Sequence, residues 1–154
     1  MLEKCHTMAQ CAQIAYMDGK EAKAEYKKLG FTGHKFIEND GAQVHIISNK
    51  ADIVLCFRGT EPSEFSDIKA DLNALPDKAD NGHGLVHNGF QTEVEKIWET
   101  IITSLGKMKT DGKHLYITGH SLGGAMATIA ASRMATTCDA LYTYGSPRAG
   151  TRKF

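Results

Sequence analysis

Charge of one sign, long apolar runs and paired cysteines are all scarce in this chain of 154 residues. Lysine plus arginine equal aspartate plus glutamate at 18 each, and no basic tract stands out, so the composition argues against a nucleic-acid partner. The longest apolar run, Ile53 to Phe57, is too short to span a membrane. No internal repeat or low-complexity segment occurs. The length therefore predicts one globular domain over residues 1–154.

Metal-ligand and redox patterns are also absent from the sequence. The cysteines are scattered and form no C-x-x-C motif, and the histidines lack the spacing of a metal site. We therefore expect neither a metal nor an organic cofactor. Residues Met1 to Lys4 are not followed by the apolar run of a signal peptide. Together with unpaired cysteines, this predicts a cytoplasmic protein, with secretion by another route left open.

One stretch, Leu115 to Ala131, organises the rest of the chain. It contains Gly119-His120-Ser121-Leu122-Gly123, a G-x-S-x-G pattern between a short apolar run and a run of small helix-forming residues. A strand, a tight turn and a helix is the context in which this pattern makes a nucleophile elbow. The turn would strain Ser121 and raise its Oγ above the sheet, and the glycines would let the helix pass close to the strand. The plainer interpretation is a glycine-rich turn with a capping serine.

Hydrophobic spacing and turn residues predict the remaining elements. Helices are expected over residues 3–17, 20–29, 63–75 and 91–105, and the elbow helix to about Met134. Strands are expected over residues 34–38, 44–48, 53–57, 115–118 and 141–144, with a short one at Leu85 and Val86. Residues 76–84 are rich in turn formers and are expected to be a surface loop. Strands alternate with helices in the second half, which predicts a parallel α/β sheet with right-handed crossovers.

Five motifs, in order along the chain, carry a resemblance to a known family. They are F-R-G-T at 57–60, D-I-K-A-D-L at 67–72, V-H-N-G-F at 86–90, the elbow at 117–125 and Y-G-S-P-R-A-G at 144–150. In these motifs the chain resembles the class 3 lipases, the fungal-lipase-like branch of the α/β-hydrolase fold. The resemblance covers essentially all of the chain. It implies an α/β fold with a largely parallel mixed sheet flanked by helices, in which the C-terminal strands of the family are missing.

The same resemblance implies a role for each matched residue. Ser121 would be the nucleophile that attacks an ester carbonyl, within an elbow formed with Gly119, His120 and Gly123. The oxyanion would be bound by the backbone N–H of Leu122 and by Thr60, through its backbone and its hydroxyl.

The implied substrate is a lipid or small ester, most simply an acylglycerol, hydrolysed through an acyl-enzyme; an acyltransferase would use the same elbow. Residues 61–70 would be a lid over the acyl pocket, and only Phe65 and Ile68 in it are large and apolar. A polar lid predicts weak interfacial activation and a preference for short or soluble esters.

The family pattern is incomplete after the serine. In this fold an acid and then a histidine follow the nucleophile, but no histidine follows Ser121, and the one later acid, Asp139, comes too early. We expect His120 to point away from Ser121 and His87 to be a structural hydrogen bonder near the site. The other histidines show no pairing in the sequence.

Three explanations are open. The chain can be the N-terminal part of a longer hydrolase whose acid and histidine lie beyond Phe154, which we favour. It can also be a catalytically incomplete module that binds lipid or protein, or a chain whose site is completed by a second polypeptide.

Overall fold

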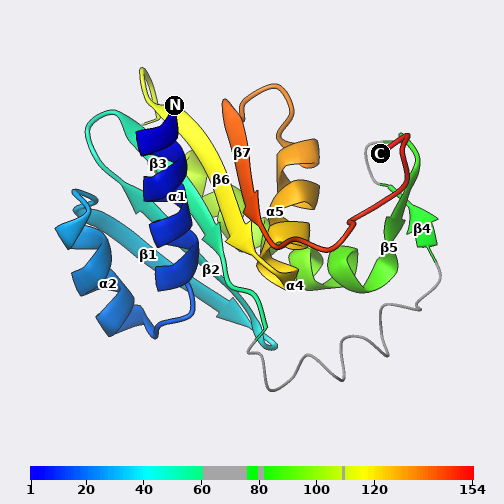
Figure 1. Ribbon diagram of the computed structural model, residues 1–154, viewed down its shortest axis with the longest axis horizontal. Coiled ribbons are helices and arrows are strands. Elements are labelled where there is room, and N and C mark those ends of the chain that lie inside the picture. The colour runs from blue at the N-terminus through cyan, green and yellow to red at the C-terminus, as the bar shows by residue number, and fades with distance from the viewer. Residues whose placement is uncertain (61–75, 80–81, 109) are drawn as a thin grey trace.

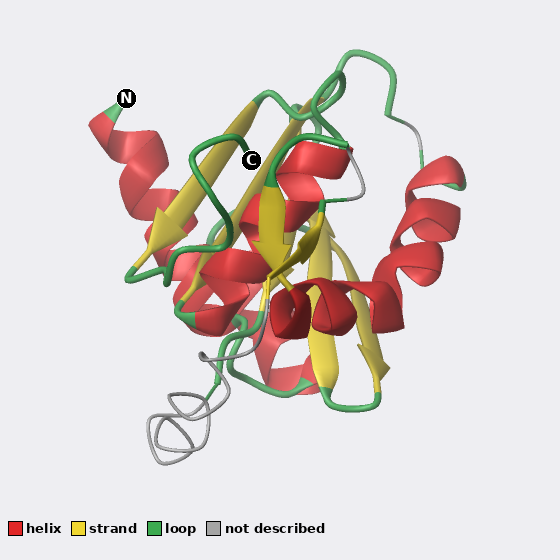
Figure 2. Cartoon of the chain, turned by 90° about the vertical axis from the view of Figure 1, so that its right-hand side faces the viewer, coloured by secondary structure: helices red, strands yellow, loops and turns green. Residues whose placement is uncertain are grey.

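The computed structural model describes residues 1–60, 76–79, 82–108 and 110–154, which form a five-stranded sheet with helices on both faces (Figures 1 and 2). Its elements, in chain order, are α1 (Leu2–Ile14), α2 (Gly19–Lys28), β1 (Gly33–Asn39), β2 (Ala42–Ser48), β3 (Asp52–Phe57), β4 (Pro76–Lys78), β5 (Leu85–His87), α4 (Asn88–Gly106), β6 (His114–His120), α5 (Leu122–Arg133) and β7 (Ala140–Tyr144). The expected helix over 63–75 and the expected lid, with Phe65 and Ile68, lie outside the described residues.

The sheet is mixed, with strand order β1-β2-β3-β6-β7. Its first half is an antiparallel meander, and the β1–β2 turn at Asp40-Gly41 has positive φ at both residues, 48° and 81°. Such turns match the twist of a hairpin, and asparagine, aspartate and glycine favour them. Its second half is parallel, because α4 and α5 return the chain so that β3, β6 and β7 all end at the same edge. This shared edge is where the G-x-S-x-G pattern lies.

Strand β3 is buried on both faces, as its unbroken apolar sequence predicts. Its side chains alternate between two cores. Ile53, Leu55 and Phe57 pack on the side of α4 and α5, while Val54 and Cys56 pack on the side of α1 and α2. Helices close each core; α4 buries one stripe of side chains, whereas α5 buries most of its residues. Among the described residues, no helix combines the length and the apolar composition that crossing a bilayer requires.

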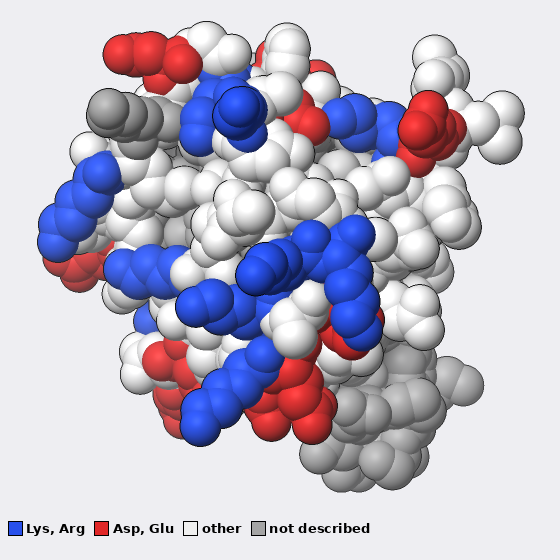
Figure 3. Space-filling model, turned by 90° about the vertical axis from the view of Figure 1, so that its left-hand side faces the viewer, with Lys and Arg blue, Asp and Glu red and all other residues white. Residues whose placement is uncertain are grey.

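The outer side of α2 is polar, as expected for residues 20–29. It carries both signs of charge, and Figure 3 shows basic side chains gathered on this end of the molecule with acidic ones beside them. The exposed charged residues of α2 are Lys20, Glu21, Lys23, Lys27 and Lys28. The ammonium of Lys28 lies 2.6 Å from the Glu25 carboxylate, one turn back. Exposed pairs of this kind add little stability, so the face is a solvated surface.

Residues 76–84 differ from the expected loop. Pro76–Lys78 form strand β4, which pairs antiparallel with β5. All three residues of β4 are exposed, and Val86 is the one buried residue of β5, so the hairpin has too little apolar alternation to be predicted as two strands. The C-terminal segment fixes β5 from the other side: the N–H of His87 donates to the Ala149 carbonyl at 2.9 Å, and the N–H of Thr151 donates to the Leu85 carbonyl at 2.8 Å.

Two histidines that show no pairing in the sequence are hydrogen-bonded inside the core under α1 and α2. His45 is fully buried, and its Nε2 lies 3.2 Å from the Ala15 carbonyl, which can only accept. The Nε2 atom therefore carries the proton, and Nδ1 accepts from His34 Nε2 at 3.0 Å. Burial lowers the pKa of His45 to about 4, with the nearby His34 and Arg58 acting in the same direction.

Acid should destabilise the fold through this pair. An unfolded His45 would take a proton near pH 6.5, whereas the folded one resists it down to a pKa of about 4. Its contribution to stability is complete above pH 6.5 and is lost as the pH falls toward 4, by about 3 kcal/mol over that interval. Urea unfolding at pH 7 and pH 4.5 would measure the loss. His45→Gln cannot titrate there and should show a clearly smaller loss; an equal loss in both proteins would contradict this assignment.

Candidate active site

Ser121 occupies a strained turn between β6 and α5. Its backbone angles are φ 56° and ψ −127°, a region that residues with a Cβ rarely adopt. The turn is tied at both ends: the N–H of Ser121 donates to the Tyr144 carbonyl of β7 at 3.0 Å, and its carbonyl accepts from Gly124 N–H at 2.9 Å. The strand, turn and helix expected around the G-x-S-x-G pattern are therefore confirmed, and so is the strain at the serine.

The glycines of the pattern are required by backbone contact. A Cβ on Gly119 would overlap the Gly123 carbonyl in the first turn of α5. A Cβ on Gly123 would overlap the Phe57 carbonyl at the end of β3 and come within 2.9 Å of Gly59 N. The end of β6, the start of α5 and the end of β3 thus meet without side chains between them. This contact brings the F-R-G-T motif beside the elbow.

Thr60 and Leu122, the two expected oxyanion donors, line one cavity of about 370 Å³. Its other lining residues are Asp40, Gly41, Ala42, Gln43, Arg58, Gly59, Glu93, Lys96 and Met126. Ser121 is next to Leu122 in the chain but is buried, with 3% of its surface exposed, and does not line this cavity. Within the described residues, no imidazole is hydrogen-bonded to its hydroxyl.

The cavity has one charged wall and one apolar wall. On the charged side, Lys96 lies 2.6 Å from Glu93 and 3.3 Å from the Asp40 carboxylate, and Arg58 donates to the Gln43 side chain at 2.8 Å. The hydrogen bond with Glu93 is the main cause that raises the pKa of Lys96. Leu122 and Met126 form the apolar side. A ligand here would meet paired charges of both signs and an apolar surface.

His120 points away from the serine, as expected. Its Nδ1 lies 2.8 Å from the hydroxyl of Tyr16, just after α1, and the two rings meet edge to face at 5.9 Å between centroids. The same hydroxyl lies where a Cβ on Gly59 would have to sit. Tyr16 therefore contacts both the elbow and the end of β3. The sequence does not predict this contact, because Tyr16 belongs to no motif and only follows the end of a helix.

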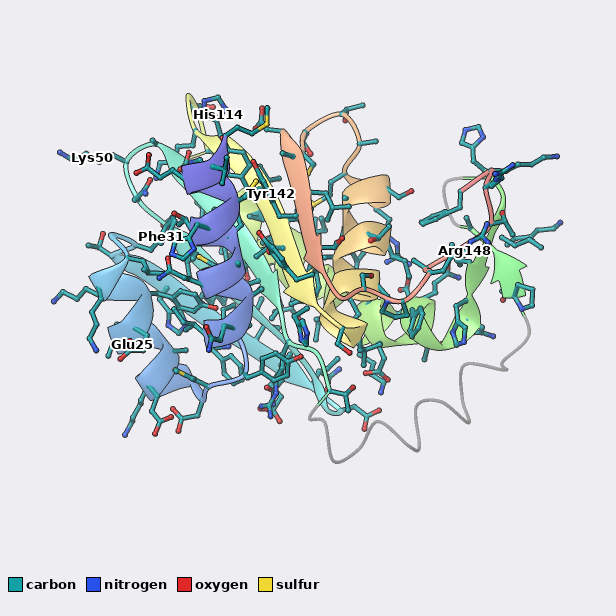
Figure 4. All side chains as sticks on the ribbon, viewed as in Figure 1. Glu25, Phe31, Lys50, His114, Tyr142 and Arg148 are labelled. Atoms are coloured by element: carbon teal, nitrogen blue, oxygen red, sulfur yellow. The ribbon has the colours of Figure 1, made fainter. Side chains whose placement is uncertain are left out.

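Asp139, the one acid after Ser121, and His87, in the V-H-N-G-F motif, also contact other residues of the fold. The Asp139 carboxylate accepts from Leu115 N–H at 2.7 Å and lies 3.5 Å from His114 Nδ1. His114 begins β6, at the end of the strand opposite Ser121 (Figure 4). The hydrogen bond from Leu115 is the main cause that lowers the pKa of Asp139. His87 stacks on Phe90, with ring centroids 4.2 Å apart.

In the described part of the chain, no group of three or more His, Cys, Asp or Glu side chains is placed so that it could bind a metal ion.

Comparison with known proteins identifies related sequences and folds. The sequence model of the family "Lipase (class 3)" matches residues 54–154. A lipase of Caenorhabditis elegans is 31% identical over 128 residues, which is 77% of this chain and 36% of that protein. The secreted mono- and diacylglycerol lipase 1 of Fusarium solani is 41% identical over 73 residues, 45% of this chain and 22% of that protein.

Among solved structures, a lipase from Rhizopus microsporus var. chinensis superposes with a TM-score of 0.74 at 22% identity, covering 98% of this chain and 59% of that one. This likeness shows the α/β-hydrolase fold of the fungal lipases. The chain spans about a third or less of the two curated relatives described above.

The strain at Ser121 should be measurable as stability. Ser121→Gly would remove the Cβ and release the strain, and after the entropy cost of glycine in the unfolded chain we expect a gain of about 1–2 kcal/mol in unfolding free energy. Ser121→Ala removes the hydroxyl but keeps the Cβ, so it should leave the strain in place. Urea titration of both variants tests this, and equal stabilities would show that the turn stores no strain.

Proposed function

Because the chain belongs to the class 3 lipase family, we propose that it carries the nucleophile and the oxyanion donors of a serine ester hydrolase. The observation that supports this most directly is the strained Ser121 at the elbow, with Leu122 and Thr60 both lining one cavity. A capping serine in an ordinary turn would not need a positive φ, since residues with a Cβ adopt it only at a cost of about 1–3 kcal/mol.

In the proposed reaction the Ser121 oxygen attacks the carbonyl carbon of an ester. A base takes the serine proton, and the carbonyl oxygen becomes an oxyanion that accepts hydrogen bonds from Leu122 N–H and from Thr60. Each such donor lowers the barrier by about 3–4 kcal/mol. The bond to the alcohol then breaks, the alcohol leaves with the proton, and the acyl group stays on Ser121 until water removes it. In this fold an acid and then a histidine follow the nucleophile, and in the proposed reaction both come from outside the residues described here.

The proposed substrate is an acylglycerol or a related lipid ester. The Fusarium relative is named as a lipase of mono- and diacylglycerols, and a glycerol part with free hydroxyls would suit the charged wall formed by Lys96, Glu93 and Asp40. The polar composition of residues 61–70 favours short or soluble esters. A cytoplasmic location belongs to the same proposal, although the Fusarium relative is named as secreted.

A second candidate is a lipid-binding or protein-binding module without catalysis. The observation in its favour is that no imidazole among the described residues is hydrogen-bonded to Ser121. In the third explanation a second polypeptide supplies the base, and the geometry around Ser121 would be the same. Chemistry at the serine separates an incomplete enzyme from a binding module.

Fluorophosphonate labelling of the 154-residue chain, with and without added imidazole, tests the proposal. A small soluble base should replace the missing histidine in part, and we expect imidazole to accelerate phosphonylation of Ser121 at least about ten-fold, because general-base catalysis typically contributes 10²–10⁴. Ser121→Ala should not react, whereas Ser146→Ala, which changes a serine packed against Gly124, should react like the unaltered chain. No labelling at any imidazole concentration would favour the binding module, and labelling that survives in Ser121→Ala would overturn the assignment.

The role of Thr60 has its own test in the same assay. If its hydroxyl helps to bind the oxyanion, Thr60→Val should slow labelling about 100-fold, because one donor is lost while the backbone N–H remains. Thr60→Ser keeps a hydroxyl and should restore most of the rate. Equal rates for valine and serine would assign the second donor to the backbone alone.

A further inference from the structure

A second cavity lies at the other edge of the sheet, where β3 and β6 begin. Its volume is about 380 Å³, at the lower end of the range of small-molecule sites. The lining residues are Ile53, Leu105, Thr110, Lys113, Leu115, Met134 and Thr137. Strand β6, which runs from His114 to His120, separates this cavity from Ser121 by about 20 Å at the usual rise of a strand. It is therefore distinct from the candidate active site.

The floor of this cavity is apolar. Ile53 is buried at the start of β3, and Leu105, Leu115 and Met134 are half-buried and pack against the core on the α4 and α5 side. These four side chains come from the starts of β3 and β6 and from the C-terminal ends of α4 and α5, so the sheet and its helices hold the walls in place. The floor offers an alkyl chain the contact that removes it from water.

The rim of the cavity is polar and carries one cation. The Thr137 hydroxyl donates to the Met134 carbonyl at 3.2 Å. Lys113 is half-buried, and no carboxylate among the described residues lies within ion-pair distance of its ammonium. Asp111, two residues earlier in the chain, is exposed and forms no ion pair with Lys113, and Asp139, the next acid after Lys113, is bound to Leu115 N–H and to His114. Within the part of the chain that the structure describes, Lys113 is thus a cation without a counterion in the lining of a mainly apolar cavity.

We propose that this cavity binds the anion of a medium-chain fatty acid, with the alkyl chain on the apolar floor and the carboxylate on Lys113. A monocarboxylate matches one ammonium, and an unbranched chain of about eight to ten carbons suits a cavity of this size. The inference goes beyond the proposed function, since binding here uses neither Ser121 nor any catalytic step. The plainer role for Lys113, a cation near the carbonyl ends of α4 and α5, is one outcome of the test.

Calorimetric titration of the 154-residue chain with octanoate, decanoate and decanol, all below their micelle concentrations, tests the site. We expect one saturable site for decanoate, with affinity rising about ten-fold from octanoate because two more methylenes are buried. Lys113→Met keeps the apolar stem and loses the charge, so it should weaken decanoate about three- to five-fold and leave decanol unchanged. Lys107→Met, an exposed lysine of the same connection, is the matched control and should bind both ligands as the unaltered chain does.

The location is tested by amide chemical shifts and by filling the cavity. Decanoate should shift the signals of Ile53, Leu115 and Met134, and Met134→Trp should abolish binding of both decanoate and decanol while circular dichroism shows an unchanged fold. Shifts confined to Thr60 and Leu122 would place the ligand in the candidate active site instead. Absence of saturable binding, or equal weakening by Lys113→Met and Lys107→Met, would leave Lys113 as a helix-end cation only and would overturn the proposal.

Discussion

Direct backbone contact between three segments is the constraint on which this structure depends. The last residues of β6, the first turn of α5 and the end of β3 touch at Gly119, Gly123 and Gly59, where no Cβ can be accommodated. The contact fixes the turn at Ser121 and brings Thr60 to the cavity that Leu122 lines. Close packing of this kind is stiff, because neighbouring backbones cannot relax as side chains do. The same geometry therefore serves both the fold and the proposed chemistry.

The two faces of the sheet support this contact in different ways. On the side of α1, Tyr16 bonds to His120 and contacts the end of β3, and the preceding residue, Ala15, accepts the hydrogen bond from buried His45. On the opposite side, α4 and α5 close an apolar core and leave the charged cavity open at its edge. Hydrogen bonds of polar side chains thus stabilise the elbow on the side of α1, while apolar packing stabilises it on the side of α4 and α5.

The proposed function assigns one half of a hydrolytic site to the described residues. In the proposed function Ser121 is the nucleophile at the elbow, and Leu122 and Thr60 are the donors on one cavity, whereas the one acid that follows the serine in the sequence, Asp139, lies at the far end of β6 with His114. This separation follows from the parallel sheet, since residues at the start and the end of a strand lie on opposite edges. The relatives are longer than this chain, and in the proposed function the base comes from outside the residues described here.

Much of this protein was determined by the sequence alone. Apolar runs, turn residues and the G-x-S-x-G pattern predict most strands and helices, the strained serine and the family, because they act through local backbone preferences and burial. Only the tertiary structure decided which distant residues meet. The hairpin of β4 with β5, the bond between His34 and His45, the contact of Tyr16 with the elbow and the cation at the second cavity depend on pairing across 10 to 100 or so positions, which no local preference encodes. These contacts form only when packing of the whole chain brings residues that are distant in the sequence together.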